Sequence, residues 1–463
     1  MYRLDWLEQL KLRLTAAPTS GGMLAVSPIV WSLGFTSLLT DISTEMVNSA
    51  LPVYLVLHLH LSPVQYGVID GIYNGLAVAL LSVAAGVIAD RTARHKEVAG
   101  FGYALSAACK LLLLLSGGAW GWIAAIVGLD RVGKGVRSAP RDALISFNTH
   151  RSALASAFAV HRGLDAGGAL IGPVVAFILL SQVPGAFDVL WLTSFVFGVL
   201  GCGILSLFIP GSRTTEAAQA REHGVDAMPV APVTPVTPVT PVTPVTPVTP
   251  VTPAEQSATS STIGETLKLL RTARFGAIAA CALLLAAVTI SDGFIYLQLQ
   301  DRTGTSASYV PLFYVGTACA YMIFSVPAGM LADRIGRRQV VIGGYAVLAI
   351  VYAMMLWGPQ SSWTAVLGCM ALMGIYYAAT EGILMALASA IVPAHLRTSG
   401  LAIIGTAIGI GKMISSFIFG WIWSAVDQYT ATVIFLAGLA ITAGISSRWL
   451  RTALREQDVV ETN

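Results

Sequence analysis

Long apolar runs separated by short polar segments dominate the chain from residue 27 to residue 449. A helix that crosses a bilayer needs about 20 mostly apolar residues, and twelve stretches reach that length. These predicted spans lie near residues 27–57, 64–89, 97–117, 120–143, 153–181, 187–209, 274–299, 309–332, 339–357, 363–391, 398–424 and 429–449. The pattern predicts an all-α membrane protein with twelve transmembrane helices embedded in a lipid bilayer.

A ten-residue sequence occurs twice, as GVIADRTARH at 86–95 and as GMLADRIGRR at 329–338. Each copy follows one apolar run and precedes another, and an internal repeat of this kind indicates two homologous halves. We therefore expect a six-helix bundle over 1–209, a cytoplasmic linker over 210–273 and a second, pseudo-symmetric bundle over 274–463. The linker contains seven consecutive Pro-Val-Thr triplets at 232–252, which favour an extended polyproline II spacer.

The distribution of basic residues predicts the orientation. Most of the 27 Lys and Arg residues lie in loops on the side of the N-terminus, and the loops on the other side carry Arg302 alone. Because positive loops are retained in the cytoplasm, an even number of spans places both termini there, with the protein in the cell (inner) membrane. The net charge of +3 reflects this retention, so we expect no nucleic-acid partner.

Composition agrees with a membrane protein. The chain is 55% hydrophobic and 11% charged, whereas soluble proteins carry about 25% charged residues. The five cysteines lie inside apolar runs without metal-ligand spacing, so we expect no metal and no cofactor. Glycines within the spans are expected to let helices approach closely, at Gly71, Gly75, Gly167, Gly168, Gly172, Gly405, Gly409 and Gly411.

Charged side chains within the hydrocarbon region are costly and usually mark an ion or substrate pathway. The span 120–143 contains such residues at helical spacing, namely Asp130, Lys134, Arg137 and Arg141. They form one stripe on a helix, and because a stripe facing lipid would be unfavourable, we expect it to face a water-filled cavity. The alternative is a buried network of ion pairs that holds helices together.

Acidic residues in the first two spans are candidates for protonation. Asp41 and Glu45 lie one turn apart, and Asp70 is followed one turn later by Asn74. A carboxylate in a low-dielectric cavity takes up a proton closer to neutral pH than one in water. The alternative is a structural charge network with Lys110 or with the basic stripe.

His161 and Asp165 in the fifth span are also one helical turn apart, with Arg162 beside them. Histidine titrates near physiological pH, and a neighbouring carboxylate favours its protonated form. These three residues are therefore further candidates for a proton pathway.

Only a few charges occur in the second half. Tyr377 and Glu381 share a helical face, and Asp292 precedes Tyr296 by one turn. Aromatic rings beside an acid suit an organic solute with a cationic group, which makes Asp292, Tyr377 and Glu381 candidate site residues. Tyrosines near a membrane boundary are also common as interfacial belt residues; this role is expected for Tyr296 and is the alternative for Tyr377.

The two ten-residue copies resemble the loop signature of the major facilitator superfamily, which joins helices 2 and 3 and again helices 8 and 9. The second copy is complete; in the first, Ala93 stands where the family prefers glycine and His95 replaces a basic residue. The resemblance implies that these loops gate the transport cycle, and the alternative is that their arginines only fix topology. The residues concerned are Gly86, Asp90, Arg91, Arg94, Gly329, Asp333, Arg334, Gly336, Arg337 and Arg338.

Further motifs resemble parts of the same superfamily. The string DRVGKGVRSAPRDA at 130–143 resembles a bacterial 12-helix subgroup with DRxGKGxRxAPRDA in helix 4, as do the DxSxEM pattern at 41–46 and the acid–glycine pair at 381–382. Arg131 resembles the fourth-helix arginine that is tied to proton movement in family antiporters, although Lys134 replaces the usual glutamine. Gly168, Gly172 and Pro173 match part of the fifth-helix antiporter signature.

Together these features predict a monomeric secondary active transporter that moves a small organic solute by alternating access, with proton-coupled efflux as the leading direction. Proton-driven import of an anionic or chelating solute, such as a siderophore, is the alternative because the stripe in span 120–143 is basic. The sequence lacks GxxxxGK[ST], HExxH and GxSxG motifs, so neither ATP-driven transport nor an enzyme is expected. A non-transporting membrane receptor is a further alternative.

Overall fold

The computed structural model describes residues 26–75, 78–149, 153–210, 269–358, 362–392 and 396–460. The Pro-Val-Thr repeat of the linker lies outside these residues. The first half contains α2 (Pro28–Pro52), the π-helical turn η2 (Val53–His58), α3 (Pro63–Gly75), α4 (Val78–Thr92), α5 (His95–Leu114), α6 (Trp120–Phe147), α7 (Leu154–Gln182) and α8 (Phe187–Phe208). The second half contains α11 (Ala273–Ala287), α12 (Asp292–Thr303), the 3-10 turn η4 (Ala307–Tyr309), α13 (Val310–Ile335), α14 (Arg337–Trp357), α15 (Trp363–Ile391), α16 (Arg397–Ala425) and α17 (Gln428–Val460).

Helices form because most of these runs are apolar and, in lipid, a helix satisfies every backbone polar group internally. Within the described residues, nine helical stretches are long and apolar enough to cross a membrane. The other predicted spans fall short for identifiable reasons. Helix α2 is rich in Ser, Thr and acidic residues, α6 carries the charged stripe, and α3 and α4 have only 13 and 15 residues.

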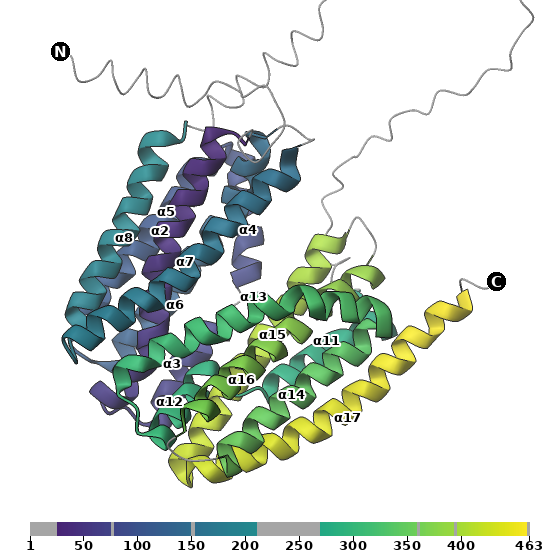
Figure 1. Ribbon diagram of the computed structural model, residues 1–463. Helices are drawn as coiled ribbons and strands as arrows, with labels where there is room; N and C mark the ends of the chain where they lie inside the picture. The colour runs from purple at the N-terminus through teal and green to yellow at the C-terminus, as the bar shows by residue number, and fades with distance from the viewer. Residues whose placement is uncertain are drawn as a thin grey trace, which may run out of the picture.

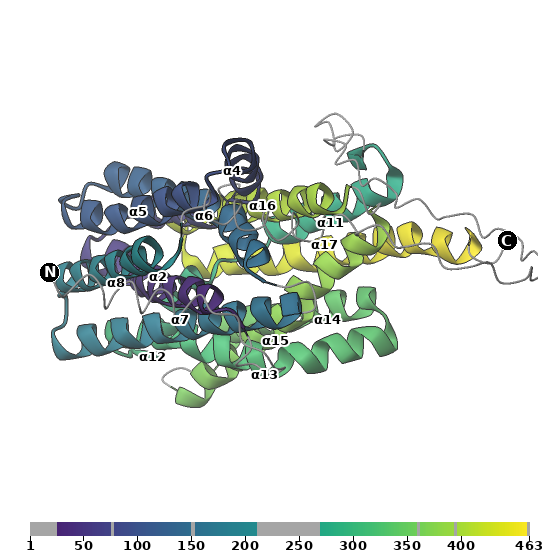
Figure 2. The ribbon, with the colours of Figure 1, turned by 90° about the horizontal axis from the view of Figure 1, so that it is seen from above.

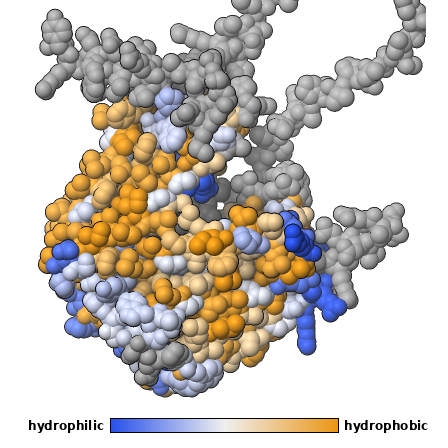
Figure 3. Space-filling view, in the orientation of Figure 1, coloured by the Kyte–Doolittle hydropathy of each residue, from blue (hydrophilic) through white to orange (hydrophobic). Residues whose placement is uncertain are grey.

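The helices pack as two bundles (Figure 1). In the first, α2 packs against α7 and α8, and α5 packs against α6 and α8; in the second, α15 packs against α13 and α14, and α11 packs against α16 and α17. Large apolar side chains cover much of the outer surface, as Figure 3 shows. This surface is the one expected for helices that face lipid.

The two most extensive contacts between the bundles join α3 with α16 and α7 with α13. Seen from above, α16 and α13 lie on opposite sides of the molecule (Figure 2). Hydrogen bonds cross between the halves at the same end, from the Val64 backbone N to Ser424 Oγ at 2.9 Å and from Ser308 Oγ to the Leu180 carbonyl oxygen at 2.9 Å. We call this the sealed end.

Glycines make the α3–α16 contact possible. A Cβ on Gly75 would lie 2.7 Å from the Gly409 carbonyl oxygen, and one on Gly71 would lie 3.1 Å from the Met413 carbonyl oxygen. A Cβ on Gly67 would collide with the carbonyl oxygen of Ser416. These three glycines are spaced four residues apart, so they form one face of α3 against which the backbone of α16 rests directly.

The predicted helix-packing role holds for most of the other glycines too. Gly168 and Gly172 on α7 face the α2 backbone, and Gly411 on α16 faces the α11 backbone, each at a distance that a Cβ would violate. Gly167 has looser neighbours, and Gly405 instead lines a cavity described below.

The two copies of the ten-residue sequence lie at the other end, which we call the signature end, where the halves diverge (Figure 1) and the surface is hollowed between them (Figure 3). Ala93 has a positive φ of 52°, and the matching Gly336 has a φ of 99°. Both residues let the chain turn from one helix into the next. Glycine adopts this conformation without strain, whereas alanine does not.

The charged residues of these loops find their partners within their own halves. His95 Nε2 lies 2.8 Å from Asp90 Oδ1 within the first half. In the second half, Arg337 donates to the Ala386 carbonyl oxygen at 3.0 Å and Arg338 to that of Ser447 at 3.3 Å. Among the described residues, no ion pair joins the two copies, because the halves are spread apart at this end.

Candidate functional site

The charged stripe of α6 is buried in the first half rather than lining a water-filled cavity. Asp130 forms an ion pair with Lys110 of α5 and, at 2.5 Å, with its neighbour Arg131. Ser106 Oγ donates to Asp130 at 2.5 Å, and the Arg131 guanidinium stacks 3.9 Å from the centre of the Tyr73 ring. The expectation of a water-facing stripe was wrong for Asp130, Arg131, Arg137 and Arg141, which are buried beside charged and aromatic side chains of the bundle.

The C-terminal part of the stripe pairs with α2 and α7 in the same way. Arg137 lies 3.3 Å from Asp41, and Arg141 lies 3.8 Å from Asp165. Asp165 also accepts a hydrogen bond from Ser37 at 2.7 Å. The network therefore joins α2, α6 and α7, which is the alternative that the sequence left open.

The remaining candidates of the first half are scattered around this network. Glu45 accepts a hydrogen bond from Asn48 at 2.9 Å, Lys134 is partly buried, and Arg162 is exposed. His161 is 1% exposed and its Nε2 has no hydrogen-bond partner among the described residues.

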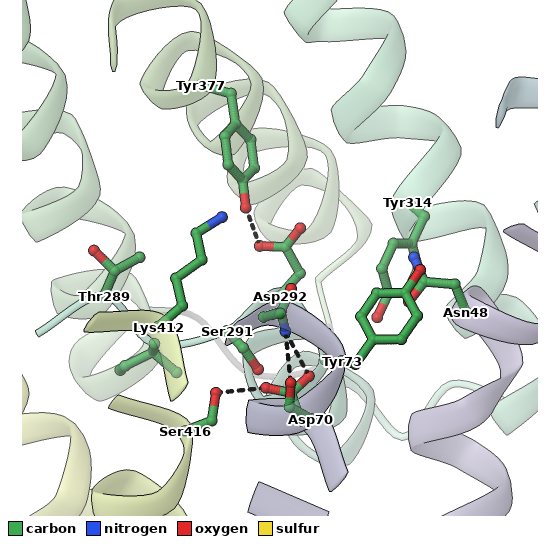
Figure 4. Close-up of a pocket in the computed structure, with 13 residues that line it drawn as sticks. Asn48, Asp70, Tyr73, Thr289, Ser291, Asp292, Tyr314, Tyr377, Lys412 and Ser416 are labelled. Atoms are coloured by element: carbon green, nitrogen blue, oxygen red, sulfur yellow. Dashed lines mark hydrogen bonds between the residues drawn. The ribbon is translucent and has the colours of Figure 1, made fainter. Parts of the chain in front are cut away.

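A different constellation lies between the halves, near the sealed end. Asp70 of α3 accepts hydrogen bonds from Asn74 at 3.1 Å and from Ser416 of α16 at 2.6 Å. On the other side of the same chamber, Asp292 accepts a hydrogen bond from Tyr377 of α15 at 2.5 Å (Figure 4). Two carboxylates from opposite halves thus line one chamber of about 60 Å³.

Asp292 reaches this chamber because the predicted seventh span is broken. Helix α11 ends at Ala287 and α12 begins at Asp292, so the segment 288–291 is not helical. Its backbone is held by side chains of other helices. The Ile290 N–H donates to the Tyr352 hydroxyl at 2.7 Å, and Ser415 donates to the Thr289 carbonyl oxygen at 2.5 Å.

A second, larger cavity of about 350 Å³ adjoins the chamber and lies entirely within the second half. Its wall is formed by Ala286, Thr289, Tyr345, Tyr376, Tyr377, Thr380, Glu381, Leu384, Met385, Gly405, Ile408 and Lys412. Thr289, Tyr377 and Lys412 line both spaces, so they form the partition between them. The Lys412 Nζ lies 5.9 Å from the centre of the Tyr377 ring.

The sequence candidates are thus divided among three places. Asp70, Asp292, Tyr377 and Glu381 line the chamber or the larger cavity. Asp41, Asp130, Arg131, Arg137 and Asp165 belong to the buried network. Glu45, Lys134, His161 and Arg162 lie around that network without an ion pair of their own among the described residues. Asn48 and Tyr73 line the chamber and connect the two sets, because they contact Glu45 and Arg131.

Several lining residues were not predicted. Lys412 lies within the predicted span 398–424, but its neighbours could not be read from the sequence. Ser416 and Tyr314 carried no signal that distinguished them from packing residues. Tyr296 was expected in an interfacial belt; it is instead wholly buried and donates to Thr317 at 2.6 Å, so that interpretation was wrong.

Within the described ranges, no three His, Cys, Asp or Glu side chains gather in a metal-binding arrangement.

Comparison with known proteins identifies relatives over most of the chain. The family model of the Major Facilitator Superfamily matches residues 33–317 and 278–462. An uncharacterized MFS-type transporter of Methanocaldococcus jannaschii is 27% identical over 440 residues, covering 91% of this chain and 94% of that protein.

Solved structures share the fold. The crystal structure of the nucleoside transporter NupG superposes with a TM-score of 0.69 at 14% identity, over 91% of this chain and 98% of that one. A POT family transporter in complex with 5-aminolevulinic acid superposes with a TM-score of 0.67 at 12% identity, over 92% and 96% of the two chains. At these identities the likeness concerns the fold alone.

Proposed function

Because the chain belongs to the major facilitator superfamily, we propose that it is a secondary active transporter that moves a small organic solute by alternating access, coupled to protons. The main support for this proposal is the chamber between the halves, which is lined by one carboxylate from each half, Asp70 and Asp292. Carboxylates in such surroundings are sites at which a proton can be bound and released.

We further propose that twelve helices cross the membrane. In this arrangement α2 with η2, α3 with α4, and α6 span beside the nine apolar stretches, because their polar residues face protein rather than lipid. The signature end and both termini are then cytoplasmic, the linker is a cytoplasmic spacer, and the protein acts as a monomer in the inner membrane. The present conformation is open toward the cytoplasm and sealed on the outside.

Asp70 connects coupling to gating in this proposal. Its carboxylate accepts the Ser416 hydroxyl hydrogen across the α3–α16 contact. Opening the sealed end separates these two groups and exposes Asp70 to the outside, where it exchanges a proton. Asp292 stays with the second half throughout, because its partner Tyr377 belongs to the same bundle.

The buried network serves as a structural support in this cycle. Asp130 and Arg137 keep α6 joined to α5 and α2 through ion pairs with Lys110 and Asp41, so the first bundle moves as one body. The arginines and acids of the signature loops would close the cytoplasmic side when the halves approach each other.

Efflux by exchange with protons is the leading direction, since the partial fifth-helix motif at 168–173 resembles family antiporters. Import by proton symport is the second candidate. The single observation in its favour is Lys412, a cation on the wall of the larger cavity that is suited to an anionic group of a solute.

The test uses the purified full-length protein in proteoliposomes with a pH-sensitive dye inside and pools of candidate solutes outside. We expect a solute-dependent pH change whose sign separates antiport from symport, lost in Asp70→Asn and Asp292→Asn. Asp301→Asn is the matched control, because Asp301 is exposed and lines neither cavity. Solute movement without a pH change would contradict proton coupling, and no movement of any solute would contradict transport.

A further inference from the structure

The two charged side chains on the wall of the larger cavity differ from every charged group of the buried network. In the buried network of the first half, opposite charges pair with one another, as Lys110 does with Asp130 and Arg137 does with Asp41. Glu381 and Lys412 have no such partner: among the described residues, no oppositely charged group lies within 4.0 Å of either. They also do not form an ion pair with each other, although both line the same cavity.

A charged side chain within a membrane-spanning helix usually marks an ion or substrate pathway. Glu381 is exposed and Lys412 is partly buried, so a solute that enters the cavity can reach both. Here one cation and one anion remain available in a single space, Lys412 from α16 and Glu381 from α15. Figure 4 shows the Lys412 side chain extended toward Tyr377 and Asp292, so its ammonium lies where the cavity and the chamber meet. A ligand that carries one negative and one positive group would complete both positions.

The rest of the wall indicates the body of that ligand. Three tyrosine rings and several aliphatic side chains surround the cavity; the rings belong to Tyr345, Tyr376 and Tyr377. Tyr345 and Tyr376 pack edge to face, with ring centres 5.5 Å apart. Aromatic rings provide both apolar contact and attraction for an ammonium group. A volume of about 350 Å³ is near the lower end of small-molecule sites, which span roughly 300–1,000 Å³.

We propose that the larger cavity binds a small zwitterionic solute with an apolar or aromatic body. Glu381 pairs with its ammonium group, Lys412 pairs with its carboxylate, and the tyrosines enclose its body. This assignment rests on the proposed transport function and names the class of substrate for it.

The experiment measures binding to the purified full-length protein by isothermal titration, with probes that differ only in charge. The probes are phenylalanine, phenylalaninamide, N-acetylphenylalanine and N-acetylphenylalaninamide, which carry both charges, the cation alone, the anion alone and neither. A parallel leucine series tests an aliphatic body. We expect the zwitterion of at least one series to bind, with each singly charged analogue at least tenfold weaker and the neutral analogue weakest.

Two variants assign the charges to their partners. Glu381→Gln should abolish the preference for the free ammonium, so that phenylalanine and N-acetylphenylalanine bind alike. Lys412→Gln should abolish the preference for the free carboxylate, and Lys412→Arg should keep it. The controls Asp301→Asn and Arg271→Gln, at exposed positions away from the cavity, should leave the ratios of the dissociation constants unchanged.

Misfolding does not imitate these outcomes, because each variant is judged by a ratio between two probes and by an unchanged melting temperature. The proposal is overturned when no zwitterion of either series binds, when charge-blocked analogues bind equally well, or when both glutamine variants keep the wild-type preferences.

Counterflow in proteoliposomes separates this proposal from the proposed function. Zwitterion binding without any counterflow would refute transport and leave the ligand class in place. Transport of a solute that is indifferent to Glu381→Gln and Lys412→Gln would refute the ligand class and leave transport in place.

Discussion

Adding one methyl group to α3 should open the sealed end. In Gly75→Ala, the new Cβ would lie 2.7 Å from the Gly409 carbonyl oxygen, which is 0.7 Å less than the 3.4 Å at which ordinary contact begins. The Cβ of Met413 blocks the same direction, and neither group is the flexible end of a side chain. The contact cannot accommodate the methyl group unless α3 and α16 move apart.

The free-energy cost of Gly75→Ala can be estimated. Overpacking of this kind typically costs about 1–3 kcal/mol, and it applies only to the conformation in which α3 and α16 touch. The equilibrium should therefore shift about 5- to 150-fold toward the conformation that is open at this end. Gly71→Ala is a graded companion, because its Cβ would fall only 0.3 Å short of ordinary contact with the Met413 carbonyl oxygen, at 3.1 Å. Its shift should be smaller.

The assay is a spin-label distance measurement in nanodiscs, on a background without the native cysteines. Labels at Ala119→Cys and Ala425→Cys report the opening, since both positions are exposed at the sealed end and belong to different halves. Gly203→Ala is the matched control, because nothing lies within 4 Å of a Cβ at that position. Equal distance distributions for Gly75→Ala and Gly203→Ala would refute the assignment of this contact as the outer seal.

Three further results are expected. Asp130→Asn leaves Lys110 buried without its carboxylate and should destabilise the first half by about 3–5 kcal/mol. Denaturant titration in micelles measures this change, and an unchanged free energy of unfolding would contradict the pairing. Ala93→Gly removes the strain of a positive φ, so it should stabilise the protein by about 0.5–1 kcal/mol after the entropy of glycine is counted; a lower melting temperature would count against this reading. Tyr377→Phe keeps the ring but removes the 2.5 Å hydrogen bond to Asp292, a charge-assisted bond worth about 1.5–3 kcal/mol. Solute-driven proton flux should therefore fall at least tenfold. Undiminished flux would show that the transport cycle does not depend on this bond.

The features that followed from the sequence are those set by local spacing. Gly71 and Gly75 are four residues apart in an apolar run, which is enough to predict a close helix contact but not its partner. The repeat at 86–95 and 329–338 predicted two halves, and its position after an apolar run predicted a turn between helices. The turn at Ala93 shows that the backbone geometry is kept even where glycine is absent.

The features that did not follow depend on residues far away in the chain. Helical spacing put Arg137 and Arg141 on one face of α6 but could not show that this face meets α2 and α7, whose acids are at Asp41 and Asp165. The break at 288–291 contains neither glycine nor proline; its backbone is satisfied by Tyr352 and by Ser415, more than 60 residues away. Asp292 therefore looked like one more charge within a span rather than the first residue of a new helix.

The distribution of hydrogen bonds and ion pairs explains why the conformational change should take place at the interface between the halves. Among the residues that the structure describes, few side-chain bonds cross at the sealed end, and they involve the hydroxyls of Ser416, Ser424 and Ser308 rather than ion pairs. Bonds of this kind contribute about 0.5–1.5 kcal/mol when neutral and about 1.5–3 kcal/mol when one partner is charged. Breaking a buried ion pair inside a half costs about 3–5 kcal/mol for each pair. A motion that separates the halves at this end thus loses a few hydrogen bonds and the packing of α3 on α16 and of α7 on α13, whereas a motion within the first half would have to break the network around Asp130. Rigid-body movement of the two bundles about the chamber is therefore the conformational change of lowest cost, and it is the one that alternating access requires.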